Sequence, residues 1–351
     1  MRLGRITRAF ACLLAAGALL AGCGSSDSTD TSGASPENLP APARSEFPAT
    51  EGRSLLEVLE DAGPSEFVVS PAGTVYYEGK NRFPFGVFER DRSQVADAEV
   101  ALYIAPVPEV NPKAEKDGAK GADARADIKA LEEPATGPFP AQVESLLTQS
   151  AFRAQTTSND PDAASVVYAT EIEFPTNGEW RIAAVFKEGD ELSATLLPSV
   201  IVGSVKRVPR VGEKAPLIHT PTREDVGGEL SELTTRIPPD TQNEVDYADA
   251  YGREPIILLF ATPQFCQSRV CGPVVDVAEQ VKELYGEKSA FIHMEIFEDN
   301  EPPDVNEQVK AFHLPTEPWL FAIEKDGMVA EVLQGAFGVD ALTRAVEKVS
   351  E

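Results

Sequence analysis

The sequence predicts a multidomain protein in which an all-β sandwich is followed by an α/β domain. Three observations lead to this prediction. Over 51–206, apolar residues alternate with a period of two, as in half-buried strands. From residue 256 onward, short apolar runs alternate with segments of helical periodicity, as in an α/β fold. Ahead of both, residues 23–50 consist mostly of Ser, Thr, Asp, Gly, Ala and Pro, which is typical of a flexible tether.

Residues 1–22 have the pattern of an export signal. Three arginines precede an apolar stretch over 9–21 that is too short to span a bilayer. The stretch ends in Leu-Ala-Gly-Cys at Cys23, which resembles the lipobox of bacterial lipoproteins. The resemblance implies cleavage before Cys23, a lipid on its thiol and an anchor on the extracytoplasmic face of the cell membrane. The alternative is an ordinary secretory signal that ends near a cysteine.

The charge balance excludes some partners. The chain has 57 acidic and 31 basic residues and a formal net charge of −26, and the acidic residues are spread along its whole length. Such a chain is repelled by nucleic acid and by anionic membrane surfaces, so we expect neither as a partner. An acidic, solvated exterior that keeps an exported protein soluble is the simpler interpretation. With 42% hydrophobic residues, the chain has enough apolar material for two cores.

The β domain is expected over 51–206 and opens with a short helix around Leu55–Leu59. Seven β-branched and aromatic runs follow, separated by Pro, Gly and Asn: EFVVS, TVYYEG, RFPFGVF, AEVALYIAPV, SVVYATEIEF, EWRIAAVF and SATLLPSVIVGSV. Residues 174–178 read Phe-Pro-Thr-Asn-Gly, a hairpin or turn signal. Seven short strands with such punctuation predict an immunoglobulin-like β-sandwich with Trp180 in its core. Near 110–140 the pattern is lost, which predicts a long surface insertion with about one pair of helical turns.

The residue types of the β domain limit what it can bind. No His, Cys or Met occurs from 51 to 206. Soft metal ions are held by these three side chains, so we expect no such site in this domain. The β domain could then either space the second domain from the membrane or contact a partner.

The α/β domain is expected over 256–351, with 207–255 as a linker and N-terminal extension. The apolar run IILLF predicts a strand covered on both faces. Helical spacing then predicts a helix from about Val274 to Tyr285. The remaining elements are the strand AFIHMEIF, a short helix carrying Val305, Val309 and Phe312, a hairpin that turns at Lys325-Asp326-Gly327, and a closing helix with Leu342, Ala345, Val346 and Val349.

This order of elements, with the pair Cys266 and Cys271 before the first helix, resembles the thioredoxin fold. Two further marks support the resemblance. The Gly-x-x-Ala-Pro sequence at 212–216 is similar to the opening of membrane-anchored thioredoxin-like reductases, peroxiredoxins and oxidase-assembly copper chaperones. Pro318 stands just before the strand WLFAI, where the family places a proline that follows a cis bond and packs against the cysteines.

The resemblance also implies site residues. By position, Cys266 would attack a substrate disulfide and Cys271 would resolve the mixed disulfide. Phe265 would cover the thiol in place of the usual Trp. Pro318 would shape the substrate groove, and Glu317 would offer its backbone to an extended peptide. The implied partners are exported protein thiols or disulfides, and no cofactor is implied.

Acid–base support for the pair is a point of difference from the family. The family often buries a carboxylate on the strand before the cysteines, and residues 256–260 contain none. Glu317 is expected close by and could serve, or it could raise the thiol pKa and slow the pair. Arg269, between the cysteines, would act in the opposite sense.

The spacing of the pair decides whether a disulfide can form. In one ideal helix, residues 266 and 271 would lie about 8–9 Å apart, whereas a disulfide needs Cα atoms within about 7 Å. A bridge therefore requires a loop, and Gly272-Pro273 favours a helix that starts at Pro273 after such a loop. The competing picture starts the helix at Gln267 and kinks it at Pro273. We favour the loop, because two free cysteines outside the cell are expected to pair.

Three functions fit these features. The first is membrane-anchored thiol–disulfide exchange on exported proteins by Cys266 and Cys271. The second is a non-enzymatic, surface-binding lipoprotein in which the Cys266–Cys271 disulfide is structural. The third, less favoured, is a copper chaperone, which would need a histidine in addition to the cysteines. The candidates are His293, expected as a packed core residue, and His313, expected at a helix end; we therefore predict no metal site.

Overall fold

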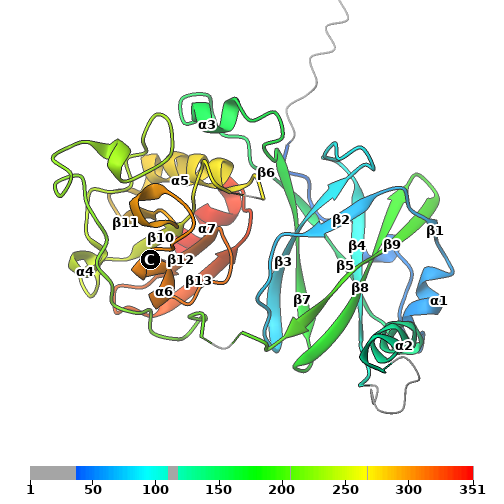
Figure 1. Ribbon diagram of the computed structural model, residues 1–351. Coiled ribbons are helices and arrows are strands. Elements are labelled where there is room, and N and C mark those ends of the chain that lie inside the picture. The colour runs from blue at the N-terminus through cyan, green and yellow to red at the C-terminus, as the bar shows by residue number, and fades with distance from the viewer. Residues whose placement is uncertain (1–36, 110–117, 206, 267, 351) are drawn as a thin grey trace, which may run out of the picture. The chain divides into compact units, whose positions relative to one another are not determined.

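The computed structural model describes residues 37–109, 118–205, 207–266 and 268–350, and Figure 1 shows their helices and strands. The predicted export signal, the lipidation site Cys23 and the first part of the tether lie outside these residues. In the part of the chain that the structure describes, no helix is both long and apolar enough to cross a bilayer.

The first half of the described chain contains two β-sheets (Figure 1). One has the order β1-β9-β8-β4-β5 and the other the order β2-β3-β7-β6. All neighbours are antiparallel except β1 and β9. The strands are β1 (Gly63–Pro64), β2 (Val68–Pro71), β3 (Gly79–Phe88), β4 (Glu99–Pro106), β5 (Thr136–Pro140), β6 (Gln142–Ser145), β7 (Val166–Phe174), β8 (Gly178–Glu188) and β9 (Glu191–Val202).

The two sheets share one apolar core. Phe83 and Phe85 of β3 pack with Leu102 of β4 and Ile182 of β8, and all four are fully buried. Trp180 belongs to the same core at 4% exposure, as predicted. The alternation of apolar residues along these strands therefore does form one buried layer between two sheets.

The other face of the five-stranded sheet is covered as well, which explains why β4 is buried on both sides. Alternate residues of β4 pack against the helix α1 (Leu55–Leu59) and against Phe47, which is 5% exposed. The side chain of Ser54 accepts a hydrogen bond from the Glu57 backbone, and the Glu57 carboxylate accepts one from the Ser54 backbone, so α1 begins with a capping box. The short helix predicted here is confirmed.

The predicted tether over 23–50 extends too far. Leu39 pairs with Val143 of β6 through two backbone hydrogen bonds. The 3₁₀ helix η1 (Arg44–Glu46) follows, and then Phe47 enters the core. One large aromatic side chain and a few backbone hydrogen bonds order a segment whose composition alone resembles a linker. Residues 37–50 thus belong to the folded part of the chain.

Three other expectations in this half need correction. The insertion near 110–140 contains the helix α2 (Gly118–Glu132) and then β5, a strand of the five-stranded sheet, so it is not only a surface excursion. Of the run TVYYEG only its last residue, Gly79, lies in a strand, although Tyr76 is buried and stacks on Phe83. The turn after Phe174 joins β7 to β8, which lie in different sheets, so it is a crossover and not a hairpin.

The second half contains a four-stranded sheet of order β11-β10-β12-β13. The strands β10 and β11 are parallel, and β12 and β13 are antiparallel to their neighbours. Their bounds are β10 (Ile256–Phe260), β11 (Ala290–Met294), β12 (Trp319–Ile323) and β13 (Val329–Gln334). The predicted strand–helix–strand–helix–hairpin–helix order is observed.

Helices cover both faces of this sheet. On one face, α5 (Cys271–Tyr285) and α7 (Val339–Ser350) pack over alternate residues of β10 such as Ile257 and Leu259. On the other face, α4 (Tyr247–Ala250) and α6 (Glu307–Ala311) pack over Ile256, Leu258 and Phe260. The continuous apolar run IILLF is the consequence, because a strand buried on both faces has no polar side.

The segment 207–255 is more than a linker. Lys214 forms a bridge with Met328 beside the hairpin, and Ala215 enters the core of the α/β half. Six polar residues over 234–243 are buried, although their sequence has no apolar periodicity: Thr234, Thr235, Arg236, Asp240, Gln242 and Asn243. The outlying elements are α3 (Gln155–Ser158), η3 (Leu230–Glu232) and η4 (Glu298–Asn300).

Candidate functional site

Cys266 and Cys271 form a disulfide, with Cα atoms 5.9 Å apart. The helix α5 begins at Cys271, so Cys266 lies in a loop ahead of it, as the favoured interpretation requires. The helix starts two residues earlier than predicted, at Cys271 and not at Pro273. Pro273 is tolerated inside the first turn because the N–H groups there have no partner within the helix.

The two sulfur atoms differ in exposure. Cys271 is fully buried, while Cys266 is half-buried at the protein surface. The Cys271 backbone N–H donates to Sγ of Cys266 across 3.4 Å, and Oγ of Ser268 lies 3.2 Å from the same sulfur. Since the N–H belongs to the first turn of α5, the helix end would favour negative charge on Cys266 after reduction.

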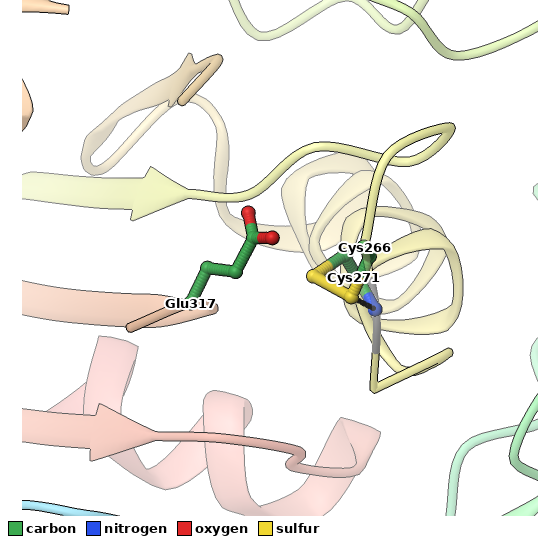
Figure 2. A group of neighbouring side chains, drawn as sticks. All are labelled: Cys266, Cys271 and Glu317. Atoms are coloured by element: carbon green, nitrogen blue, oxygen red, sulfur yellow. Dashed lines mark hydrogen bonds between the residues drawn. A yellow bond between two sulfur atoms is a disulfide. The ribbon is translucent and has the colours of Figure 1, made fainter. Parts of the chain in front are cut away.

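Glu317 and Pro318 lie opposite the pair, at the start of β12. The Glu317–Pro318 peptide bond is cis, as the resemblance to the thioredoxin fold implied. Figure 2 shows the Glu317 carboxyl group, which comes from the segment just before β12, on the side of that segment facing the two sulfurs. One carboxylate oxygen of Glu317 and the sulfurs of Cys266 and Cys271 all lie within 4.8 Å of one another. The expected proximity of Glu317 to the pair is therefore observed.

The Glu317 carboxyl group is in an unfavourable place for a negative charge. Its burial, with a smaller effect from the charge of Glu295, raises the pKa of Glu317 to about 7. Its Oε2 atom is buried and has no hydrogen-bond partner. Glu295, which follows β11, likewise has a buried Oε2 atom without a partner, while its Oε1 atom accepts hydrogen bonds from the backbone and side chain of Thr235.

Phe265 and Arg269 flank the pair on the surface. Phe265 is 37% exposed and meets Phe297 edge to face, with ring centroids 6.3 Å apart. Arg269 forms an ion pair with Asp162, so its charge is already balanced and does not act on the cysteines alone.

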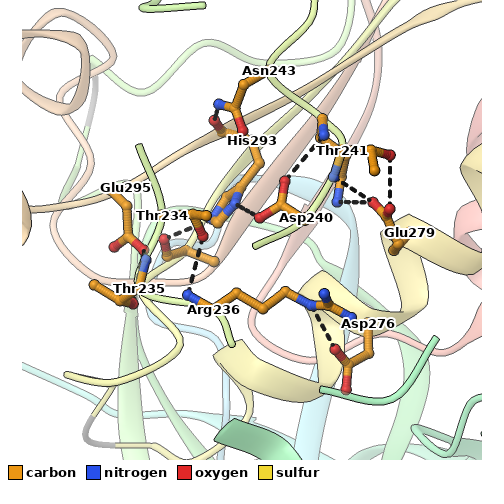
Figure 3. A network of polar contacts seen from close by, with 12 residues as sticks. Thr234, Thr235, Arg236, Asp240, Thr241, Asn243, Asp276, Glu279, His293 and Glu295 are labelled. Carbon is orange, nitrogen blue, oxygen red and sulfur yellow. Dashed lines mark hydrogen bonds and ion pairs between the residues drawn. The ribbon is translucent and has the colours of Figure 1, made fainter. Parts of the chain in front are cut away.

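A polar network that the sequence did not reveal lies deeper in the same half (Figure 3). His293 on β11 is buried, as predicted, and its partner is the buried carboxylate of Asp240. Nδ1 of His293 lies 2.8 Å from Oδ2 of Asp240, and Nε2 lies 3.1 Å from the Ala261 carbonyl oxygen. No signal in the sequence marks Asp240, because it stands in a Pro-rich segment without periodicity.

The same segment also contacts α5. Nε of Arg236 donates to Oδ1 of Asp276 at 2.9 Å, and both side chains are buried. A carboxylate among the valines at 274, 275 and 277 of an apolar helix face was the one available signal of a buried partner. The network thus connects residues 234–243 to the helix that begins at Cys271.

The histidines do not complete a copper site of the expected kind. Within the described residues, the possible metal ligands gathered at the pair are Cys266, Cys271 and Glu317, without a histidine. Both ring nitrogens of His293 are already hydrogen-bonded elsewhere. The less favoured copper-chaperone interpretation therefore gains no support from the geometry.

Comparison with solved structures finds several matching chains. A crystal structure of a thiol:disulfide interchange protein of the thioredoxin family from Chlorobium tepidum TLS matches with 17% sequence identity, over 40% of this chain and 98% of that chain, at a TM-score of 0.29. No protein-family model matches the sequence, and neither does any curated protein.

Proposed function

We propose that this protein is a thiol–disulfide oxidoreductase that acts on exported proteins through Cys266 and Cys271. The observation that best supports the proposal is the unequal exposure of the two bonded sulfurs at the start of α5. An exchange reaction needs one sulfur that a substrate can reach and a second that the substrate cannot reach. Cys266 and Cys271 meet these two requirements in that order.

The reaction follows from the two positions. In the reducing direction, the Cys266 thiolate attacks one sulfur of a substrate disulfide, and the other substrate sulfur leaves as a thiolate. The Cys271 thiolate then attacks Sγ of Cys266 and releases the second substrate sulfur. The Cys266–Cys271 disulfide forms and the substrate gains two thiols, so two electrons pass to the substrate. A substrate dithiol drives the same steps in reverse.

The resemblance to thioredoxin-like proteins implies that a substrate peptide binds beside Cys266. Phe265, which precedes Cys266 and is 37% exposed, would offer an apolar contact. Glu317 and Pro318 precede β12, and the backbone of Glu317 would pair with an extended peptide. This assignment of Glu317 and Pro318 follows the resemblance to thioredoxin-like proteins.

We further propose that a lipid on Cys23 anchors the protein to the extracytoplasmic face of the cell membrane, with the immunoglobulin-like sandwich as a spacer. Such a location is oxidising, and a disulfide persists there. Replacing Cys23 by Ser should release the protein from washed membranes and abolish incorporation of labelled palmitate. If the Cys23→Ser protein still sediments with the membranes and takes up label, the lipoprotein assignment is wrong.

A redox titration tests the exchange function. The purified full chain is equilibrated with a series of glutathione buffers and its free thiols are trapped by alkylation. An active exchanger should have a potential above about −300 mV, within reach of cellular couples. A pair that stays oxidised far below this value would favour the alternative, a binding lipoprotein in which the bridge is structural.

Trapping of the intermediate provides the second test. Cys271→Ser should accumulate a mixed disulfide between Cys266 and a substrate protein, because the resolving thiol is missing. Cys266→Ser is the matched control and should accumulate little, since Cys271 is buried. Equal trapping by the two variants would contradict the assigned roles.

A further inference from the structure

We propose that the reduced form of the protein binds one Zn²⁺ ion through the thiolates of Cys266 and Cys271 and the carboxylate of Glu317. The site uses the same cysteines as the exchange reaction, but it would exist even if the pair exchanged with no substrate. It requires only that the Cys266–Cys271 disulfide be opened.

The distances between the ligand atoms fit a metal site. The two sulfurs and one Glu317 carboxylate oxygen lie within 4.8 Å of one another. A tetrahedral zinc ion with Zn–S bonds of about 2.3 Å and a Zn–O bond of about 2.0 Å needs ligand atoms about 3.5–3.8 Å apart. After reduction the sulfurs separate from bonding distance toward this value, and the carboxylate oxygen has to move by no more than about 1.3 Å.

The charges around the site also favour a cation. Glu317 and Glu295 each have a buried Oε2 atom without a hydrogen-bond partner. A buried polar atom of this kind calls for an explanation, and an ion is one of the few available. The nearby cation Arg269 is paired with Asp162. With Glu317 ionised, the two thiolates and its carboxylate would carry three negative charges, of which a divalent ion offsets two.

The mixture of ligands points to zinc among the metals. Zinc accepts thiolate sulfur and carboxylate oxygen in one tetrahedral site, and three protein ligands leave its fourth position for water. Cu(I) prefers sulfur ligands alone, and it would bind the two thiolates without need of Glu317. Magnesium and calcium take oxygen ligands and would not select the cysteines.

Metal binding and disulfide formation exclude each other. When Zn²⁺ binds, the two thiols give up their protons to solvent, as does the Glu317 carboxyl group where it is protonated, and no electrons move. When an oxidant such as a substrate disulfide takes two electrons from the pair, Sγ of Cys266 bonds to Sγ of Cys271 and Zn²⁺ is released. Bound zinc would thus hold the pair reduced, and oxidation would expel the ion.

A competition titration tests the site in the full chain. Cys12 and Cys23 are replaced by Ser in every sample, so that the pair provides the only thiols. The protein is reduced with a phosphine, and Zn²⁺ is titrated against a chromophoric chelator. Co²⁺ is used in parallel, because thiolate-to-cobalt charge transfer reports sulfur ligation directly. Glu317→Gln is the test variant, and Glu324→Gln, an exposed position of the same domain, is the matched control.

The expected result is one Zn²⁺ per reduced chain and none on the oxidised chain. Glu317→Gln should weaken the affinity at least about tenfold, the smallest loss typical even for an outer partner of a metal ligand, and Glu324→Gln should leave it unchanged. Unchanged affinity in Glu317→Gln would show binding by the sulfurs alone and overturn the proposal. Absence of stoichiometric binding to the reduced chain would overturn it too. Far-ultraviolet circular dichroism and reoxidation to the disulfide confirm that each variant is folded.

Discussion

The imidazole of His293 and the carboxylate of Asp240 form an ion pair that is completely removed from water. Nδ1 of His293 faces Oδ2 of Asp240, and Nε2 faces the Ala261 carbonyl oxygen. Both ring nitrogens therefore face acceptors, so the ring carries both protons and a positive charge. Burial by itself would lower the pKa of His293, but Asp240, with a contribution from Glu295, raises it to about 9. Burial would raise the pKa of Asp240, but His293 lowers it to about 2.

These pKa values predict how stability depends on pH. The pKa of His293 is raised on folding. The contribution of this shift to the free energy of unfolding is therefore complete below about pH 6.5 and is lost as the pH rises through about 9. The pKa of Asp240 is lowered on folding. The contribution of this shift to the free energy of unfolding is therefore complete above about pH 3.8 and is lost as the pH falls toward 2. Urea unfolding should show a free energy of unfolding that declines between pH 6.5 and 9. Asp240→Asn should remove this decline and cost about 3–5 kcal/mol at pH 6. An unchanged pH profile in Asp240→Asn would contradict the pairing.

A second buried pair, Arg236 with Asp276, is expected to stabilise the start of α5 only as a unit. Burial raises the pKa of Asp276 although Arg236 and other hydrogen-bond donors lower it, so the carboxylate is costly to bury. Arg236→Met should destabilise the protein by about 3–5 kcal/mol, because it leaves the buried Asp276 carboxylate without its cation. The double variant Arg236→Met/Asp276→Leu should recover part of this loss, although the Ala154 N–H that donates to Asp276 then lacks its acceptor. Urea unfolding of these two variants and of the single variant Asp276→Leu completes the cycle, and additive losses would show that the residues act independently.

The difference in exposure between the cysteines predicts a difference in their reactivity. After reduction, Cys266 should be alkylated by iodoacetamide at least about ten times faster than Cys271, since thiolate character and access both favour it. Mass spectrometry of peptides from timed samples gives the two rates. Ser268→Ala removes the hydroxyl that lies 3.2 Å from Sγ of Cys266 and should slow that thiol modestly without affecting Cys271. Equal rates would mean that the two sulfurs are equally accessible.

The folded part of the chain is expected to begin before residue 50. Phe47→Ala should lower the free energy of unfolding by about 3–5 kcal/mol, because it opens a cavity in the core beside Tyr103 and Leu55. Leu56→Ala, at a 42% exposed position of α1, is the control and should change stability by about 0.5 kcal/mol or less. If Phe47→Ala behaves like the control, residues 37–50 are a tether after all.

Local pattern was sufficient for most of the elements. The run IILLF, the helical spacing from Val274 to Tyr285 and the hairpin turning at 325–327 each appear in the structure close to the predicted bounds. Apolar residues recur with a period of two in a strand and of 3.6 in a helix, because one face of the element is buried. Such a period can be recognised from residues that are close together in the sequence. The cysteine pair and Pro318 can also be recognised from adjacent residues. The cysteines stand just before a predicted helix, and Pro318 stands just before a predicted strand.

Contacts between distant segments could be decided only by the tertiary structure. Phe47, β5 and residues 234–243 looked like linker or insertion, because their composition is polar and their partners lie far away in the chain. Glu317 could be expected near the cysteines, but its unpartnered oxygen and raised pKa depend on burial and on Glu295. A pKa is set by the desolvation and charges that a fold brings together. The sequence by itself therefore determined the elements and the thiol pair, while the fold decided which charged groups surround that pair and hence what it can bind.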